Sequence, residues 1–231
     1  MASTGTYAYN PYASNLTLVA YGRIGIRRSE IQTQHMTDAE QEANLLQVEM
    51  GNKQPLYWRS ELYTQELTSG TATYTLPARM IAMQAAFLST EIDDATTDRV
   101  IWPLSAYEYA AVPNKTLEAV PTSYWYNRQI TPTVTMWPVP DDAATYTLNL
   151  RILSQVQDAS LSSGATLDMP YRFLDVFVAG LAHRLSRIYA PDKEQMRKMD
   201  YMEAWKNAAQ RDVEDQVSLN VMPAFSGYFR R

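Results

Sequence analysis

Cysteine is absent from the chain of 231 residues. Disulfides, thiolate nucleophiles and cysteine-based metal sites are therefore excluded. Histidine is almost as scarce, since only His35 and His183 are present and they lie far apart in the sequence. Neither histidine lies in one of the usual hydrolase or nucleotide-binding motifs, so we expect neither a histidine relay nor a multi-histidine metal site. These absences leave catalysis by carboxylates as the remaining possibility for an active site.

Basic runs and long apolar runs are also missing. The net charge is −5, so the chain should repel nucleic acid unless its charge is strongly segregated. Residues 1–11 have neither the cationic start nor the apolar core of a signal peptide. The most apolar segment, residues 173–185, carries charged side chains and is shorter than the ~20 residues that span a bilayer. We expect a soluble protein, made without secretion and without a membrane partner.

Helical patterns occur at both ends of the chain. Residues 15–26 predict a short helix, and Thr37 with Glu40 forms a capping box before apolar residues that recur at helical spacing until Gly51. Near the other end, Asp168 and Pro170 are start signals for a helix that is apolar on nearly all sides and should be buried.

A last helix is predicted after the breaker at residues 190–192, with Asp192 and Gln195 at its cap. Its apolar residues form one stripe, which we expect to pack into the core: Met199, Met202, Trp205, Ala208, Ala209 and Val213.

The middle of the chain is rich in Tyr, Thr, Phe and Ile, which favours strands. We expect an acidic turn over residues 91–98 and a helical turn over residues 106–111. Residues 138–142 are predicted to join the last two strands as a hairpin loop. The predicted strands cover residues 56–67, 71–76, 80–89, 99–105, 131–137 and 145–153.

These patterns predict an α+β fold, in which N- and C-terminal helices form a helical bundle and a small antiparallel β-domain is inserted between them. The expected division is 1–54 for the first helices, 55–160 for the β-domain, 161–218 for the last helices and 219–231 for an extended C-terminal tail.

Acidic pairs are the remaining candidates for catalysis. Asp93 with Asp94 and Asp141 with Asp142 stand in turn contexts, where Asp is expected for backbone reasons alone. A glycosidase needs two carboxyls held roughly 5 to 10 Å apart across a cleft, which sequence neighbours do not supply. We therefore predict no catalytic residue, no cofactor and no metal.

The C-terminal tail combines aromatic residues with arginines, as the anchors of protein interfaces do. Its predicted contact residues are Met222, Phe225, Tyr228, Phe229, Arg230 and Arg231. A second aromatic stretch, residues 121–141, alternates as a strand and carries prolines where strands begin and end. From this stretch we predict Trp125, Tyr126 and Trp137 as contacts with a neighbouring subunit or a tail protein.

Motifs of Pro, Trp and Tyr give the chain its resemblance to a family. Over most of residues 14–215 it resembles the head-to-tail adaptor proteins of short-tailed bacteriophages, also called tail tubular protein A or packaged-DNA stabilisation proteins. The motifs that carry the resemblance are Tyr74-Thr-Leu-Pro77, Pro103-Leu-Ser-Ala-Tyr-Glu-Tyr109, Pro121-Thr-Ser-Tyr124, Val134-Thr-Met-Trp-Pro-Val-Pro140, Met169-Pro-Tyr-Arg-Phe-Leu-Asp175 and Leu181-Ala-His-Arg-Leu185.

The resemblance implies a structural virion protein that forms a dodecameric ring beneath the portal. It implies contacts with the portal protein through residues 219–231. It also implies contacts through the β-domain with a tail tube or nozzle protein, with tail fibres as a further candidate partner. Packaged double-stranded DNA would be retained and conducted without specific binding. The protein would assemble in the host cytoplasm and reside in the neck of the virion.

The residues alone leave two other functional classes open. One is a virion-associated, carboxylate-dependent cell-wall hydrolase. The other is a host-surface or glycan-binding module, in which Trp125, Trp137 and the tyrosines would stack on sugar rings.

Overall fold

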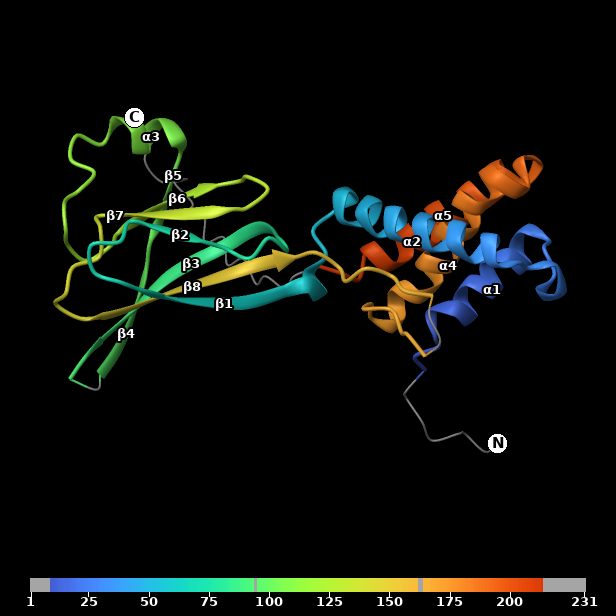
Figure 1. The fold of residues 1–231 in the computed structure, drawn as a ribbon, viewed down its shortest axis with the longest axis horizontal. Coiled ribbons are helices and arrows are strands. Elements are labelled where there is room, and N and C mark those ends of the chain that lie inside the picture. The colour runs from blue at the N-terminus through green and yellow to red at the C-terminus, as the bar shows by residue number, and fades with distance from the viewer. Residues whose placement is uncertain (1–8, 94, 162–163, 214–231) are drawn as a thin grey trace, which may run out of the picture.

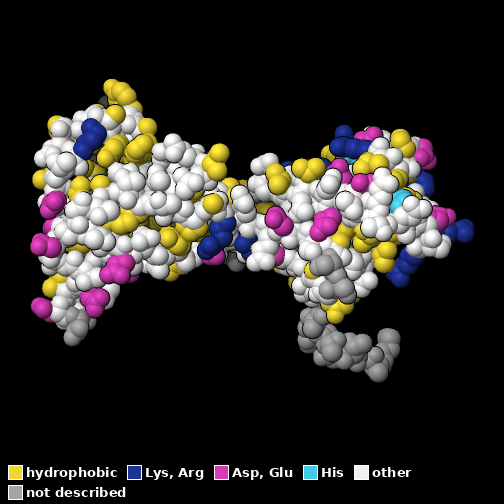
Figure 2. Space-filling model, viewed as in Figure 1, with side chains coloured by type: hydrophobic (Ala, Val, Ile, Leu, Met, Phe, Trp, Pro, Cys, Tyr) yellow, Lys and Arg dark blue, Asp and Glu magenta, His cyan; other side chains and the backbone are white. Residues whose placement is uncertain are grey.

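The structure is a computed structural model, and it describes residues 9–93, 95–161 and 164–213. Two lobes meet at a narrow waist (Figures 1 and 2). The helical lobe is built from both ends of the chain, and the β-lobe from its middle. The predicted α+β architecture, a helical bundle with an inserted β-domain, is confirmed.

The helical lobe is organised around α4, which packs against α1, α2 and α5. Its core side chains include Phe173, Phe177 and Leu181 of α4, and α4 is buried along most of its length as its apolar pattern predicts. The helices are α1 (Ala13–Ile24), α2 (Thr33–Lys53), α4 (Tyr171–Tyr189) and α5 (Glu194–Ala209), with 3₁₀ turns at Arg28–Glu30, Tyr57–Arg59 and Pro191–Lys193.

The predicted limits of α2 are wrong at both ends. The helix begins at Thr33, because the Gln32 N–H donates to His35 Nδ1 at 3.1 Å and the Thr37 capping box is not used. It also continues past Gly51 to Lys53, whose ammonium forms an ion pair with Glu49 one turn earlier.

The predicted caps of the other helices are also not used. Pro170 precedes α4 and Lys193 precedes α5, neither with a side-chain capping bond. Asp168, predicted as the cap of α4, binds Arg59 instead. The break at residues 190–192 is confirmed as the 3₁₀ turn between α4 and α5.

The β-lobe contains two four-stranded sheets that face each other, in the orders β1-β8-β3-β4 and β2-β7-β6-β5. The first sheet is antiparallel throughout, and in the second β5 runs parallel to β6. The elements are β1 (Ser60–Leu67), β2 (Thr73–Thr75), β3 (Met80–Ile92), β4 (Ala95–Val100), β5 (Trp102–Leu104), α3 (Ala106–Ala111), β6 (Ser123–Asn127), β7 (Thr133–Trp137) and β8 (Thr145–Ser154).

The core of the β-lobe follows the alternation of the strands. Leu148, Leu150 and Ile152 of β8 are fully buried, and they meet Val134 and Met136 of β7 from the other sheet. This second core shares no residue with the core of the helical lobe.

The β-lobe differs from prediction in several places. The predicted strand 99–105 is divided between β4 and β5, which lie in different sheets, and β6 was not predicted. Residues 91–98 belong mostly to a hairpin of β3 and β4, which turns at Asp93 with a positive φ of 49°. The strands β7 and β8 lie in different sheets, so residues 138–142 cross between sheets and do not form a hairpin loop. The partner of β7 in its own hairpin is β6.

Candidate interaction surfaces

Arg59 holds the waist between the lobes. Its guanidinium donates to Asp168 Oδ2 at 2.6 Å, to the Gln155 carbonyl at 2.7 Å and to Ser154 Oγ at 3.1 Å. Ser154 ends β8 and Asp168 precedes α4, so one side chain joins the end of the β-lobe to the start of the second helical segment.

Asp212 forms a second contact at the waist. Its buried carboxylate accepts from Arg172 of α4 at 2.5 Å and from the Tyr57 N–H at 3.1 Å. The end of the described C-terminal region is thereby fixed beside the start of the β-lobe.

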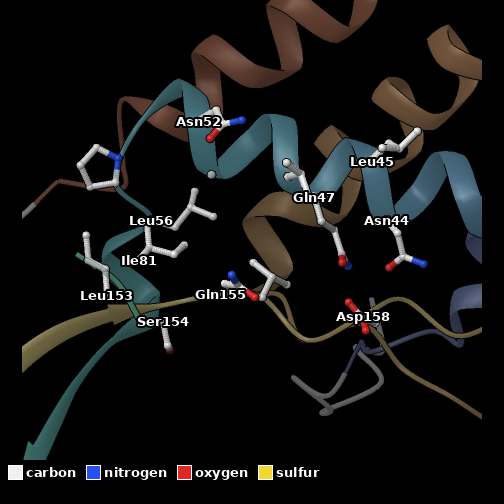
Figure 3. A pocket seen from close by; sticks show the side chains of 14 residues that line it. Asn44, Leu45, Gln47, Asn52, Leu56, Ile81, Leu153, Ser154, Gln155 and Asp158 are labelled. Atoms are coloured by element: carbon white, nitrogen blue, oxygen red, sulfur yellow. The ribbon is translucent and has the colours of Figure 1, made fainter. Parts of the chain in front are cut away.

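A groove with a volume of about 430 Å³ opens between α2 and the waist (Figure 3). One wall is α2, and the other is formed by the start of β3, the end of β8 and the linker that follows β8. Three apolar side chains of the groove are exposed to solvent: Leu45, Val48 and Ile81.

Gln47 lies in this groove with an unsatisfied amide. Its side chain is only 6% exposed, and its Nε2 has no hydrogen-bond partner. In Figure 3 the amide points toward the linker that carries Gln155 and Asp158. The neighbouring Asn44 differs, because its amide donates to the carbonyls of Glu40 and Ala159 and accepts from the Ala159 N–H. A buried donor without a partner is costly, so the groove has a place for an acceptor.

A protein-family model, that of the SU10 adaptor proteins, matches residues 16–224. The match runs through both lobes and the waist. The chain belongs to the SU10 adaptor protein family. A comparison with curated proteins finds no match. The resemblance to phage adaptors is confirmed at the level of a bacteriophage structural adaptor, and the narrower assignment to tail tubular protein A stays a prediction.

Two of the three aromatic residues predicted as subunit or tail contacts, Trp125 and Trp137, hold one loop in place. Trp125 stacks on Tyr109 of α3 with ring centroids 5.3 Å apart, and Trp137 Nε1 donates to the Asn114 carbonyl at 3.0 Å. Tyr126 packs against the β-core instead. Trp125 and Trp137 thus fasten the segment around α3, and a contact with another protein stays a prediction for all three.

The segment around α3 presents aromatic side chains that the sequence reasoning did not single out. Tyr107 of α3 is 84% exposed, and Trp102 of β5 is also exposed. Figure 2 shows hydrophobic side chains gathered over this end of the β-lobe. The capping box of Ser105 and Glu108, which places Tyr107 in the first turn of α3, was a signal in the sequence. Exposed aromatic patches of this kind mark interaction sites.

The residues predicted to bind the portal lie outside the described residues. This applies to Met222, Phe225, Tyr228, Phe229, Arg230 and Arg231.

The charge of the adaptor is divided between the lobes. Residues 55–160 carry 11 acidic and six basic side chains, so they account for the whole net charge of −5. Acidic side chains gather at the end of the β-lobe that carries the β3–β4 hairpin, far from the helices (Figure 2). The helical segments are neutral overall.

The predicted apolar stripe of α5 is only partly buried: Met199, Met202 and Val213 are exposed, which contradicts the prediction, whereas Trp205 and Ala208 pack into the core as predicted. Met199 is 64% exposed, and Met196 and Met202 are also exposed. The buried face of α5 carries Tyr201, which the predicted stripe did not include, together with Ala208. The spacing of Tyr201, Ala204 and Ala208 signalled this face, but the larger number of methionines pointed to the other one.

Ionisable groups inside the helical lobe are paired with each other. Arg184 donates to Glu42 at 3.0 Å and to Glu49 at 2.7 Å, joining α4 to α2. Burial acts to raise the pKa of Glu49, but hydrogen bonds from Lys53 and Arg184 outweigh it and lower the pKa overall. Burial, reinforced by the charge of Glu49, raises the pKa of Tyr201.

One of the candidate carboxylates of the β-lobe, Asp141, has structural partners. Asp141 accepts from the Tyr146 hydroxyl at 2.6 Å and from the Ala143 N–H at 3.2 Å. Burial and the bond to Asp141 raise the pKa of Tyr146 to about 12. Within the described ranges, no group of three or more His, Asp or Glu side chains is placed to hold a metal ion. No helix in the described part of the chain has the length and apolarity needed to cross a bilayer.

Proposed function

We propose that this protein is a ring-forming head-to-tail adaptor, which links the portal to the tail tube or nozzle and has no enzymatic role. The observation that carries the proposal is the adaptor-family match, which extends over both lobes. A two-lobed subunit suits such a link, because each lobe has its own core and its own end of the molecule to present to a different partner. Several such subunits, twelve in a dodecameric ring, would form the neck of the virion after assembly in the host cytoplasm.

The helical lobe is the portal-facing end in this proposal, and residues 219–231 are the segment that binds the portal. Two features support the role of residues 219–231. The chain preceding this segment is fixed at the waist by Asp212, and the segment itself carries the aromatic and arginine residues typical of interface anchors. The partner on the other side would be a tail tube or nozzle protein, with tail fibres as a further candidate.

The β-lobe is the tail-facing end, with Trp125, Tyr126 and Trp137 at or beneath the contact. Support comes from the exposed Tyr107 and Trp102 on the segment that Trp125 and Trp137 fasten. The acidic surplus of this lobe favours passage of double-stranded DNA without specific binding, because like charges repel.

Electron microscopy of purified portal particles mixed with the protein tests the proposal. The expected result is an added ring on one face of the portal. A protein that stays monomeric and leaves the portal unchanged would contradict the proposed function. A variant lacking residues 219–231 should fold normally and lose portal binding. As a matched control, Tyr107→Ser alters the β-lobe tip and should leave portal binding intact.

A further inference from the structure

We propose that the groove beside α2 receives the methionine face of α5 from the next copy of this chain, so that these two surfaces join neighbouring subunits of the ring. The inference rests on the proposed ring function. It adds to that function the two surfaces that form the contact between subunits.

The groove has the features of a docking site. Leu45, Val48 and Ile81 expose apolar surface around a hollow of about 430 Å³. Inside it, the Nε2 of Gln47 has no partner although the side chain is more than nine-tenths buried. Apolar walls with one unsatisfied donor match an occupant that brings apolar side chains and a polar acceptor.

The exposed face of α5 supplies both. Met196, Met199 and Met202 are solvent-exposed at helical spacing, and flexible thioether side chains adapt well to an irregular groove. Glu203, also exposed, stands beside Met199 and Met202 on the helix and offers a carboxylate acceptor for the Gln47 amide.

Charge is complementary as well. Asp158 lines the groove, is exposed, and has no ion pair with any described residue. Lys198 and Lys206 flank the methionines on α5, and both are exposed and without an ion pair in the described part of the chain. Opposite charges at the rim of an interface guide its orientation.

The two surfaces lie on different sides of the helical lobe. Glu49 and Lys53 of α2 contact Tyr201 of α5, whereas Gly51 faces the groove. Successive helical residues are about 100° apart, so Gly51 lies about 160° around α2 from both Glu49 and Lys53. One copy therefore cannot place its own α5 face in its own groove. A contact between unlike surfaces of identical copies is heterologous and forms a ring when the rotation closes.

Introduced thiols test the contact directly, because the chain has no cysteine of its own. The variant Val48→Cys with Met199→Cys, treated with a short bis-maleimide at a concentration where the protein assembles, should give a ladder of cross-linked multimers. The control pairs Met199→Cys with Ile130→Cys, which is 98% exposed on the β-lobe, and should give no ladder.

Two variants that each introduce a negative charge provide an independent readout. Val48→Asp damages the groove alone, and Met199→Asp damages the α5 face alone. Both positions are exposed, so both variants should keep the parent's thermal unfolding. Each should lower the association constant of the contact about tenfold, equivalent to a loss of ~1.4 kcal/mol per contact. A mixture of the two keeps one intact groove and one intact α5 face, so it should form heterodimers and nothing larger.

The remaining outcomes distinguish a failure of the proposed contact from a failure of the proposed ring function. A ring that forms normally with both variants, or cross-links only at other positions, overturns this contact and leaves the adaptor function standing. A cross-link within single chains between Val48→Cys and Phe225→Cys would show the chain's own C-terminal segment in the groove, and would also overturn it. A protein that stays monomeric even with portal particles overturns both.

Discussion

The two lobes use charged side chains in opposite ways. In the helical lobe, Arg184 and Arg172 form ion pairs between segments far apart in the sequence, at side chains that are mostly buried. In the β-lobe, the ion pair formed among the described residues is the exposed contact of Arg79 with Glu61, and the surplus acids lie on the surface. Paired strands satisfy each other's backbone groups, whereas separate helices need side chains to fix their orientation. Charged side chains thus form largely buried ion pairs between segments in one lobe, and lie mainly on the surface in the other.

The largest loss of stability should come from a large-to-alanine substitution in one core at a time. Phe177→Ala in the helical lobe should cost about 3 to 5 kcal/mol, and Leu148→Ala in the β-lobe about 2 to 5 kcal/mol, because both side chains are fully buried. Hydrogen exchange followed by mass spectrometry should show lost protection mainly in the lobe that carries the change, since the two cores share no residue. Equal loss in both lobes from either variant would mean that the molecule unfolds as one unit.

The waist should be the next most sensitive place. Arg59→Ala removes three hydrogen bonds of a largely buried guanidinium and leaves Asp168 without its ion-pair partner, so we expect a loss of about 2 to 3 kcal/mol. Urea unfolding should then separate into two transitions, one for each lobe. Arg79→Ala is the matched control, because its ion pair with Glu61 is exposed and should contribute less than about 1 kcal/mol. A single unshifted transition for Arg59→Ala would show that the chain connections alone couple the lobes.

Local patterns predicted most of the elements but not the partners that adjust their ends. The apolar residues of α4 and the alternation of β7 and β8 each determine one buried face, and both were found as predicted. The start of α2 depends on His35, which stacks on Tyr189 of α4. The sheet assignment of β7 and β8 depends on pairing across the lobe. Neither contact is visible in a short stretch of sequence.

The candidate surfaces were harder to predict for a related reason. The sequence marked Trp125 and Trp137 as interface residues because they are aromatic, but their partners Tyr109 and Asn114 come from a different segment and cover them. The groove beside α2 joins residues about 30 to 110 positions apart, such as Val48, Ile81 and Val156, so no motif describes it. The α5 stripe has a helical spacing on both of its faces, and only packing on α4 decides which face is buried.

A smaller effect on stability is expected at Gly180, where α4 packs closely against α2 and α5. A Cβ on Gly180 of α4 would lie 2.7 Å from Leu46 Cδ1 and 2.9 Å from Tyr201 Cε2, and both of these side chains are buried and cannot move away freely. Gly180→Ala should therefore cost about 1 to 2 kcal/mol in net stability despite its better helix propensity. The control is Gly22→Ala in α1, where a Cβ meets nothing within 4 Å and a gain of about 0.5 to 1 kcal/mol is expected. Thermal unfolding that shifts the same way for both would refute the close packing.

The smallest effect should be a dependence on pH that is confined to the helical lobe. Both histidines of the chain belong to this lobe, and His183 is buried in α4, with Arg187 3.3 Å from its Nε2. Burial, and then the charge of Arg187, lower the pKa of His183 below its usual 6.5, although Glu194 and Glu49 act in the opposite direction and Lys198 adds a little to the lowering.

The sign of the effect follows from the direction of that shift. Below pH 6.5 the unfolded chain binds the proton more readily than the folded lobe does, so stability falls as the pH falls from 6.5 to the lowered pKa, and then levels off. Hydrogen exchange at pH 7 and at about pH 5.5 should therefore reveal weaker protection in α4 and α5, with β8 as the internal reference because the β-lobe has no histidine. His183→Gln should remove this difference, and Arg187→Gln should reduce it, since one cause of the lowered pKa is gone. An equal loss of protection in β8 would assign the effect to carboxylates of both lobes and not to His183.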